Sequence, residues 1–315
     1  MRSKGKAKKR IAVIGFGSQG RAIALNLRDS GYPVLVGLRN RSKLRRAAKV
    51  DGFRSICTLG DATALADVVC FAFPDHLHGK VFKREIGPHL RPGATLVFLH
   101  GMSVHFGLVK PPPDCDVVLL APHAPGSAVR EKYLSDRSVS AFYSVHQNRS
   151  RHAGRTLSEL ARAIGFRKQR LVKTTFRDEA IGDLFGEQTV LCGGLAMLIK
   201  TGFELLVERG IKPGNAYLEV AYQLDLIVSL IKKYGLAGML NRISVAARYG
   251  SIRSGPKIID SHTKSRMRRI LADIESGRFA KRLGALEPAQ VRALNKASLR
   301  LTTKELERAA RKYSR

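Results

Sequence analysis

Three glycines near the N-terminus have the spacing of a phosphate-binding turn. Gly15, Gly17 and Gly20 form a G-x-G-x-x-G pattern directly after the apolar run IAVIG and before a stretch with helical spacing. In that context the glycines permit a tight turn, a close approach of the backbone to a pyrophosphate, and close packing of helix on strand. The N-terminus of the helix offers free N–H groups to the phosphates. The pattern therefore predicts a dinucleotide site rather than a glycine turn without a ligand.

The end of the second apolar run distinguishes between the two nicotinamide dinucleotides. An NAD site usually ends its second strand in Asp or Glu, which holds the 2′-hydroxyl of the ribose. Here the run ends in Leu38-Arg39, and a loop follows that contains Arg41, Ser42 and Lys43. Because a cationic, hydroxyl-bearing loop attracts a 2′-phosphate, the sequence favours NADPH.

Carboxylates with helical spacing lie farther along the chain. Asp183 and Glu187 are four residues apart, and Glu219 and Gln223 repeat the spacing with an amide in the second place. Two facing helices with such pairs could hold divalent cations through oxygen ligands. The spacing alone favours solvated helix faces, but both pairs lie in apolar stretches, where unpaired carboxylates are unfavourable. Both interpretations stay open on these residues alone.

Apolar runs alternate with helical stretches over the first half of the chain. Their length and β-branched content fit buried strands of a parallel sheet covered on both faces. The expected strands are 11–15, 34–38, 67–73, 95–99, 116–121 and 138–145. Repeated alternation of strand and helix predicts a doubly wound α/β domain of the Rossmann type.

The pattern changes near residue 176. From 178 to about 234 it is apolar and helical, with a break near 210–213, and further helices are expected around 237–249, 260–280 and 288–313. We therefore expect two domains, a dinucleotide-binding domain at 1–176 and an all-α domain with a basic tail at 177–315.

The composition bounds the possible functions. Lys and Arg outnumber Asp and Glu by 56 to 25, which gives a formal net charge of +31. Such a charge attracts polyanions, so nucleic-acid binding is a rival function. The charge is spread over the whole chain, however, without zinc-finger spacing, an RNP-type aromatic motif or a basic heptad region. A generally basic surface is therefore favoured over a dedicated nucleic-acid site.

The compartment is predicted from the absence of sorting signals and the cysteine pattern. No uncharged apolar run reaches about 18 residues, so no membrane span is expected. The basic N-terminus has neither the apolar segment nor the cleavage site of a signal peptide. The four cysteines show no CxxC spacing and are interpreted as structural thiols. These features predict a cytoplasmic protein.

Several motifs together resemble the ketol-acid reductoisomerases in their short, bacterial-type form. The matching stretches are GFGSQGRAIALNLRDSG, VGLRNRSK, LHGMSVHFG, TTFRDEAIGDLFGEQTVLCGG, AYLEVAYQLDLI and ISVAARYGSIRSGPKII, within about residues 10–280. The resemblance implies an enzyme that uses NADPH and Mg²⁺ to convert 2-acetolactate, or its ethyl homologue, to the dihydroxy acid by alkyl migration and hydride reduction. It also implies a knotted-type helical domain that forms a homodimer, with the active site between the two domains.

The resemblance assigns roles to individual positions. Those implied for cofactor binding are Gly15, Gly17, Ser18, Gln19, Gly20, Arg39, Ser42 and Gly126. Those implied for chemistry are His100 as the catalytic histidine, Asp183, Glu187 and Glu219 as metal ligands, and Ser244 as a substrate contact from the partner subunit. Without the resemblance, a histidine at the end of a strand would be interpreted as a core residue.

Four positions depart from the family pattern. A fourth metal-binding Glu is Gln223 here, a lysine tied to the metal and substrate network is His123, a glutamine is His78, and a serine is Leu44. An amide at 223 still offers one oxygen to a cation but removes a negative charge. Three interpretations follow: a working ketol-acid reductoisomerase, a relative that only reduces a different 2-keto acid, and a non-catalytic NADPH-binding paralogue whose basic surface binds a partner.

Overall fold

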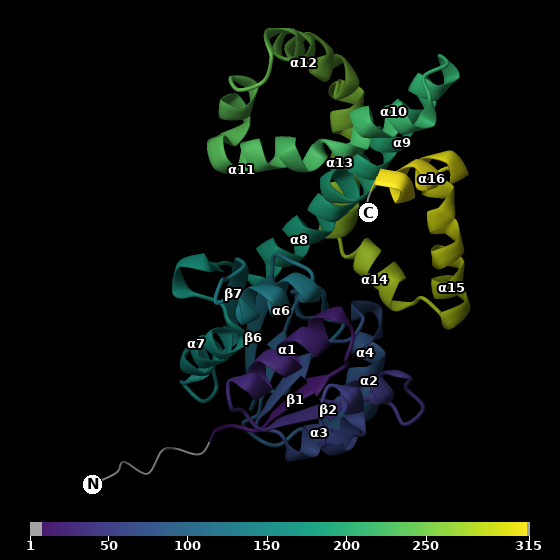
Figure 1. The fold of residues 1–315 in the computed structure, drawn as a ribbon. Coiled ribbons are helices and arrows are strands. Elements are labelled where there is room, and N and C mark those ends of the chain that lie inside the picture. The colour runs from purple at the N-terminus through teal and green to yellow at the C-terminus, as the bar shows by residue number, and fades with distance from the viewer. Residues whose placement is uncertain (1–7, 314–315) are drawn as a thin grey trace. The chain divides into compact units, whose positions relative to one another are not determined.

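The structure, a computed structural model, describes residues 8–313. The chain divides into two compact units, drawn in Figure 1. Within the described residues, unit 1 comprises the chain up to residue 182 together with 277–285, and unit 2 comprises 183–276 and the chain from residue 286 onward. The short segment 277–285, which carries helix α14 (Arg278–Gly284), thus returns to unit 1 from within the helical half of the chain.

Unit 1 is built on one eight-stranded sheet with the order β3-β2-β1-β4-β5-β6-β7-β8. The strands are β1 (Ile11–Ile14), β2 (Val34–Gly37), β3 (Ile56–Cys57), β4 (Val68–Phe71), β5 (Thr95–Phe98), β6 (Asp116–Pro122), β7 (Ala141–Gln147) and β8 (Leu171–Lys173). The strand order reverses between β1 and β4, which is where dinucleotides bind in doubly wound sheets. The predicted fold class is confirmed, with a Rossmann-type sheet in unit 1 and helices in unit 2.

The prediction of an all-parallel sheet was wrong at one strand. β7 pairs with β6 in the antiparallel direction, with Pro122 opposite Ala141. β7 also differs from its neighbours in burial, because β6 is buried along most of its length whereas Val145 and His146 of β7 are exposed. Both exposed residues lie near the end of β7, where its register against β6 shifts, so the strand is less covered there.

Helices cover both faces of the sheet (Figure 1). One face packs against α1 (Ser18–Asp29), α2 (Leu44–Val50), α6 (Gly126–Leu134) and α7 (Ala153–Ile164). The other packs against α3 (Leu59–Leu65), α5 (Met102–His105) and the start of α8 (Phe176–Gly186). Between the longer elements lie the short helix α4 (His78–Val81), a π-helical segment at Phe82–Ile86, and 3-10 turns at Asp75–Leu77, Gly87–His89 and Lys168–Arg170. Burial of Cys70 in this core raises the pKa of its thiol to about 12, as expected of a structural cysteine.

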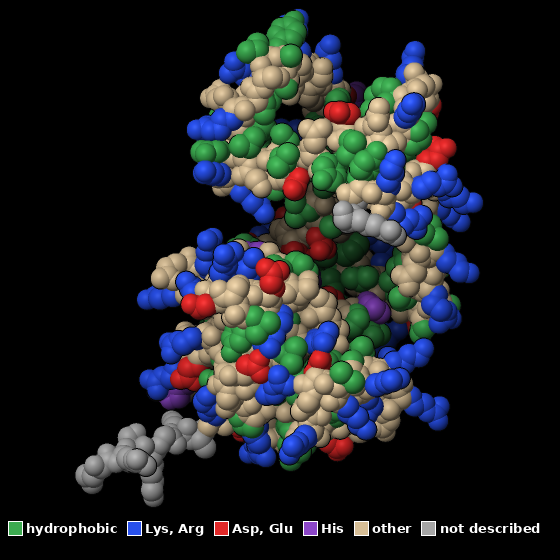
Figure 2. All heavy atoms as spheres, in the orientation of Figure 1, with side chains coloured by type: hydrophobic (Ala, Val, Ile, Leu, Met, Phe, Trp, Pro, Cys, Tyr) green, Lys and Arg blue, Asp and Glu red, His purple; other side chains and the backbone are tan. Residues whose placement is uncertain are grey.

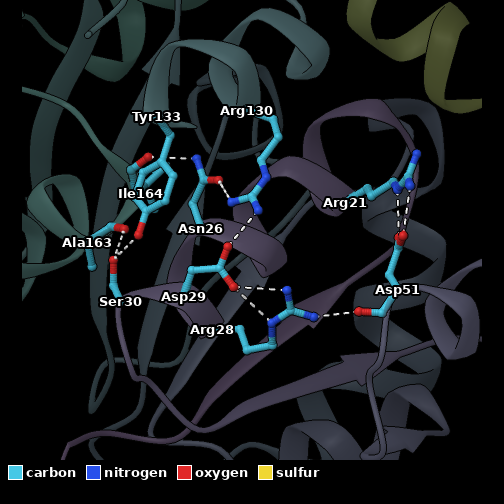
Figure 3. A network of polar contacts seen from close by, with 10 residues as sticks. All are labelled: Arg21, Asn26, Arg28, Asp29, Ser30, Asp51, Arg130, Tyr133, Ala163 and Ile164. Carbon is cyan, nitrogen blue, oxygen red and sulfur yellow. Dashed lines mark hydrogen bonds and ion pairs between the residues drawn. The ribbon is translucent and has the colours of Figure 1, made fainter. Parts of the chain in front are cut away.

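A polar network fixes α1 against two other helices (Figure 3). Asn26 is fully buried, and its amide nitrogen donates to the carbonyl oxygen of Ile164 at 2.9 Å. The Arg130 guanidinium donates to the amide oxygen of Asn26 at 2.8 Å and to Asp29 at 2.6 Å. Because both ends of the buried amide are satisfied, the network locks α1, α6 and α7 together instead of destabilising the core.

Unit 2 is almost entirely helical. Its helices are α9 (Gly193–Glu208), α10 (Pro213–Tyr217), α11 (Leu224–Leu240), α12 (Val245–Ile258), α13 (Ser261–Glu275), α15 (Pro288–Ala297) and α16 (Lys304–Tyr313). A short 3-10 turn spans Ser298–Leu301. The prediction of one helix at 237–249 was wrong. Helix α11 continues to Leu240, with a non-helical Gly235 (φ 72°) inside it, and α12 starts only at Val245.

Two short segments of unit 2 adopt the wider π-helical winding. They are Glu187–Leu191, between α8 and α9, and Leu218–Tyr222, between α10 and α11. Each begins at or next to a carboxylate singled out in the sequence, Glu187 or Glu219. Such π-turns are rare and occur frequently at functional sites.

Unit 2 buries little apolar surface within one chain. Its buried cluster contains Phe203, Ala216, Leu306 and Ala309. The helical stretch Phe176–Glu208 has a mean hydropathy of 1.8 over its most apolar window, of which 6% is buried. By length and composition alone, this one stretch of the described chain is long and apolar enough to cross a membrane, although charged residues such as Lys200 and Glu204 lie within it.

Candidate functional site

The glycine turn after β1 has the geometry that its sequence predicts. Gly15 has φ +100°, and a Cβ there would lie 2.4 Å from the carbonyl oxygen of Ala72, after β4. A Cβ on Gly20 would lie 2.5 Å from the carbonyl oxygen of Gly15. Gly17, by contrast, is exposed and faces open space. Two glycines thus permit close backbone packing, and the third leaves room for a ligand at the N-terminus of α1.

A second loop closes on this turn. The side-chain amide of Gln19 donates to the carbonyl oxygen of Ala124 at 2.7 Å, and its own oxygen is buried without a hydrogen-bond partner. Gly126, the first residue of α6, approaches so closely that a Cβ there would lie 2.0 Å from the carbonyl oxygen of Ser18. The N-termini of α1 and α6 therefore lie together, and the first backbone N–H groups and positive dipole ends of both helices would attract an anion bound there.

The loop after β2 is strongly cationic. Arg39, Arg41 and Lys43 are exposed, and Ser42 is half-buried. Arg45 of α2 points back and donates to the carbonyl oxygens of Leu38, Ile56 and Cys57 at 2.9–3.2 Å, which fixes the loop to the sheet. The exposed cations thus stand on a rigid support beside the dinucleotide turn, where a 2′-phosphate would experience an attractive field.

His100, at the end of β5, is held by a carboxylate that the sequence analysis missed. Glu179 of α8 is 4% exposed, and its oxygens lie 3.0 and 3.1 Å from Nδ1 of His100. One of those oxygens also accepts the backbone N–H of Gly101 at 2.5 Å. Glu179 therefore fixes both the ring orientation and the proton on Nδ1. The signal that could have revealed it is its spacing of four residues before Asp183 and eight before Glu187.

His78, one of the departures from the family pattern, is a core residue. It is 1% exposed, its Nδ1 lies 2.8 Å from the Ser103 hydroxyl, and its Nε2 lies 2.9 Å from the carbonyl oxygen of Phe73. Burial lowers its pKa below the ordinary value of 6.5, although Asp75 acts in the opposite direction. A neutral ring that donates through Nε2 and accepts through Nδ1 satisfies both contacts and links the loop after β4 to α5.

His123 occupies the position of the family's lysine and is exposed. Its Nδ1 lies 3.0 Å from the Ser140 hydroxyl, and its ring packs edge-on against Phe142 with centroids 4.3 Å apart. These contacts direct the imidazole along the start of β7.

The predicted metal ligands are not gathered within one chain. Asp183, Glu187 and Glu219 are all exposed. Among residues 8–313, no three His, Cys, Asp or Glu side chains form a group able to hold a metal ion. The Gln223 amide donates to Glu219 at 3.3 Å and to the carbonyl oxygen of Leu218 at 3.2 Å. The amide thus takes a hydrogen-bonding role beside a carboxylate where a second carboxylate would repel it.

Ser244 caps a helix rather than joining the other site residues. Its hydroxyl oxygen accepts the N–H of Ala247 at 3.1 Å at the start of α12. Within unit 1, the structure therefore assembles the glycine turn with Gly126, and separately pairs His100 with Glu179. The metal and substrate roles of the unit 2 residues stay predictions.

Comparison with known proteins identifies relatives over nearly the whole chain. Residues 6–169 match the model of the acetohydroxy acid isomeroreductase NADPH-binding domain, and 176–314 match that of the ketol-acid reductoisomerase C-terminal domain. The ketol-acid reductoisomerase (NADP(+)) of Pyrobaculum arsenaticum is 51% identical over 87% of this chain and 83% of its own. The enzyme of the same name from Xylella fastidiosa is 45% identical over 86% of this chain and 77% of its own.

A solved structure agrees with these matches. The NADH-preferring ketol-acid reductoisomerase from an uncultured archaeon superposes with a TM-score of 0.89 and 35% identity, over 96% of this chain and 93% of its own. Both halves of the chain, the glycine turn and the helical unit alike, are therefore those of one family. The chain belongs to the ketol-acid reductoisomerases, with an N-terminal NADPH-binding domain and a C-terminal helical domain.

Proposed function

We propose that this chain is a working ketol-acid reductoisomerase that converts 2-acetolactate to 2,3-dihydroxyisovalerate with NADPH and Mg²⁺, in branched-chain amino acid biosynthesis. The observation that carries the proposal is the coexistence of a complete dinucleotide turn with a carboxylate-held histidine, in a chain matched over both family domains. A chain that kept only cofactor binding has no need of the buried Glu179.

The residues of unit 1 fit the cofactor. Gly15, Gly17, Ser18, Gln19, Gly20 and Gly126 form the pyrophosphate cradle, and Arg39 and Ser42 receive the 2′-phosphate. When bound, NADPH supplies the hydride. The protein contributes binding and orientation, because the two helix N-termini fix the pyrophosphate and the cationic loop fixes the adenosine end.

His100 and Glu179 together serve in proton transfer. Glu179 holds the Nδ1 proton of His100, so proton exchange with the substrate takes place at Nε2. The buried carboxylate also compensates the charge of the imidazolium when the ring is protonated. His100 therefore acts as an acid–base residue and Glu179 as a positioning residue.

A homodimer completes the metal site in this proposal. Asp183 and Glu187 lie on one helical segment and Glu219 on another, and the chain alone does not bring them together. Large exposed apolar side chains on α9, α11 and α12, such as Leu198, Leu226 and Ile252, favour a second copy as their cover. Bound Mg²⁺ would polarise the oxygens of the substrate that take part in the alkyl migration.

The remaining features of the proposal are the domain boundary and the compartment. We place the boundary at 176/177, the cofactor domain before it and the substrate, metal and dimerisation domain after it. The apolar stretch 176–208 is covered in the dimer rather than by lipid, so the protein is soluble and cytoplasmic. No nucleic-acid partner is needed, because the basic residues serve general solubility and attraction of an anionic substrate.

The test is NADPH consumption with 2-acetolactate, with and without Mg²⁺, followed by identification of the product. Dihydroxyisovalerate formed only with Mg²⁺ supports the proposal. Gln223 and His123 favour two other functions enough to be tested alongside. Reduction of simple 2-keto acids without isomerisation would identify a divergent reductase. Saturable NADPH binding without turnover would identify a non-catalytic paralogue. Tight binding of a nucleic acid that is lost as the salt concentration rises would identify a nucleic-acid partner.

A further inference from the structure

A cavity lies in unit 1, away from the glycine turn. It has a volume of about 1130 Å³ and is bounded by the C-terminal end of α6, the outer half of α7, β7 and the segment that leads into β8. None of its lining residues belongs to the glycine turn, to the cationic loop at 39–43 or to the His100–Glu179 pair. Small-molecule sites are concave and of comparable size, so this cavity is large enough for a ligand of several hundred Å³.

The floor of the cavity is apolar and aromatic. Tyr133 and Tyr143 line it together with the buried Leu157. The ring of Tyr133 is fixed at its hydroxyl, which lies 2.9 Å from that of Ser30 (Figure 3). Its edge rests on Gly165. A Cβ on Gly165 would lie 2.8 Å from Cδ2 of that ring, so the glycine permits the close approach. A rigid aromatic wall of this kind is suited to stacking against a planar ring.

The rim of the cavity is cationic. Arg137, Arg162 and Lys168 line it and are exposed, and within residues 8–313 no carboxylate forms an ion pair with any of the three. A fourth cation, Arg167, is by contrast paired with Asp136 at 3.0 Å and also donates to the carbonyl oxygen of Asp136. This pair fixes one side of the rim, where Asp136 has a left-handed backbone with φ 48°. Three cations therefore remain to bind an anion.

We propose that this cavity is a binding site for a nucleoside triphosphate, separate from the dinucleotide site. The base stacks on the tyrosine-lined floor, and the phosphates bind to Arg137, Arg162 and Lys168. An aromatic floor beside three cations matches an aromatic ring attached to a polyphosphate, whereas a plain inorganic anion would use only the rim. The site does not depend on the reductoisomerase activity.

The experiment measures binding of N-methylanthraniloyl-GTP by fluorescence polarisation to the full-length chain saturated with NADP⁺, so that the dinucleotide site is occupied. We expect saturable binding. Arg162→Glu should weaken it by about tenfold or more, because the change removes a charge-assisted contact and adds repulsion. Arg155→Glu is the matched control, since Arg155 is exposed on the same helix outside the cavity, and it should change the affinity by less than about twofold.

Lys168→Glu provides a second variant from another segment of the rim, and both variants must retain NADPH binding. Tripolyphosphate should compete at least about tenfold more weakly than GTP, because it lacks the ring that stacks. The proposal is overturned if no saturable binding occurs, or if Arg155→Glu weakens it as much as Arg162→Glu. Equal competition by tripolyphosphate, or binding of single-stranded oligonucleotides but not of GTP, would also overturn it.

Discussion

Glu179 illustrates how a buried carboxylate gives a histidine a defined chemistry. Its carboxylate accepts the backbone N–H of Gly101 and lies 3.0 Å from Nδ1 of His100. The main-chain contact therefore fixes the position of the carboxylate independently of its contact with the ring. A buried carboxylate with two donors is satisfied, whereas the same group alone would be strongly unfavourable. These contacts therefore assign a proton to Nδ1 and leave Nε2 as the ring nitrogen that Glu179 does not hold.

Replacement of that carboxylate tests its role. In Glu179→Gln the amide keeps the size but cannot compensate a charged imidazole, so we expect kcat to fall by about 10²-fold. The pH dependence of kcat should also shift to lower pH, and the KM for NADPH should be unchanged. Asp178→Asn, which alters the neighbouring exposed carboxylate, is the control. Glu179 has no positioning role if the two variants have the same pH profile as the parent.

Buried His78 makes stability depend on pH. Because burial lowers its pKa in the folded state, the unfolded chain takes up the proton first as the pH falls below the ordinary value of 6.5. The contribution of neutral His78 to the free energy of unfolding is fully present above pH 6.5. As the pH falls from 6.5 toward the lower pKa of the folded state, this contribution decreases by up to about 1.4 kcal/mol per pH unit. His78→Gln, which keeps hydrogen-bonding capacity but does not titrate, should lose less thermal stability than the parent between pH 7 and 5. Parallel melting curves for the two proteins over that range would contradict this.

Gln223 is expected to set the affinity for the metal. In Gln223→Glu the new carboxylate would replace an amide that donates to Glu219 at 3.3 Å, so the variant should melt at a lower temperature without Mg²⁺. With Mg²⁺ the added charge should strengthen binding about tenfold, measured by titration calorimetry and by a larger rise in melting temperature. Gln223→Met, which removes the oxygen, should bind Mg²⁺ more weakly than the parent. Mg²⁺ affinity that is equal in all three proteins would exclude residue 223 from the site.

At the scale of elements, the sequence predicts best what local chemistry determines. The glycine turn, the longer buried strands around it and the change to helices near residue 176 all follow from spacing and composition. The short strands β3 and β8 were missed because two or three residues carry no periodicity. The antiparallel direction of β7 was missed because the direction of a strand depends on its connections and not on its own residues.

The site was predicted less completely, and for a related reason. The residues next to Glu179 in the sequence do not indicate its role, because its partner His100 is 79 residues away. The π-helical segments at Glu187 and Glu219 could not be predicted either, because the residues there have the spacing of an ordinary α-helix. Gly126 was assigned to the cofactor site by the family resemblance, but the reason for a glycine there is a contact with Ser18 that only the packing of α6 on α1 creates.

That contact gives a prediction about two helices. Gly126→Ala would place a Cβ 2.0 Å from the carbonyl oxygen of Ser18, so α6 must move away from the cofactor cradle. We expect NADPH affinity to fall at least about tenfold, at a destabilisation of about 1–3 kcal/mol typical of overpacking. Gly154→Ala is the control, because that position in α7 faces open space and should gain up to about 1 kcal/mol of helix stability. Unchanged NADPH binding in Gly126→Ala would remove α6 from the cofactor site.

At the scale of the whole molecule, the net charge opposes self-association and the exposed apolar side chains favour it. Figure 2 shows Lys and Arg side chains distributed over the visible surface instead of gathered in one patch. A net charge of +31 opposes self-association, particularly at low salt. Unit 2 nevertheless exposes many large apolar side chains around a buried cluster of very few residues. A helical unit with so small a core of its own needs a further apolar surface to pack against, and a second copy would supply one by symmetry.

We therefore predict that the apolar face of unit 2 holds a dimer together. Leu198 of α9 is 52% exposed in the single chain, so Leu198→Glu should convert a dimer into a monomer of 34.7 kDa, measured by light scattering after size exclusion. Val50→Glu is the matched control, because Val50 is 78% exposed on unit 1 and should leave the dimer intact. The Leu198→Glu monomer should still bind NADPH through unit 1 but should lose turnover, since its metal carboxylates no longer meet. A parent protein that is monomeric, or a Leu198→Glu monomer that remains active, would show that one chain completes the site alone.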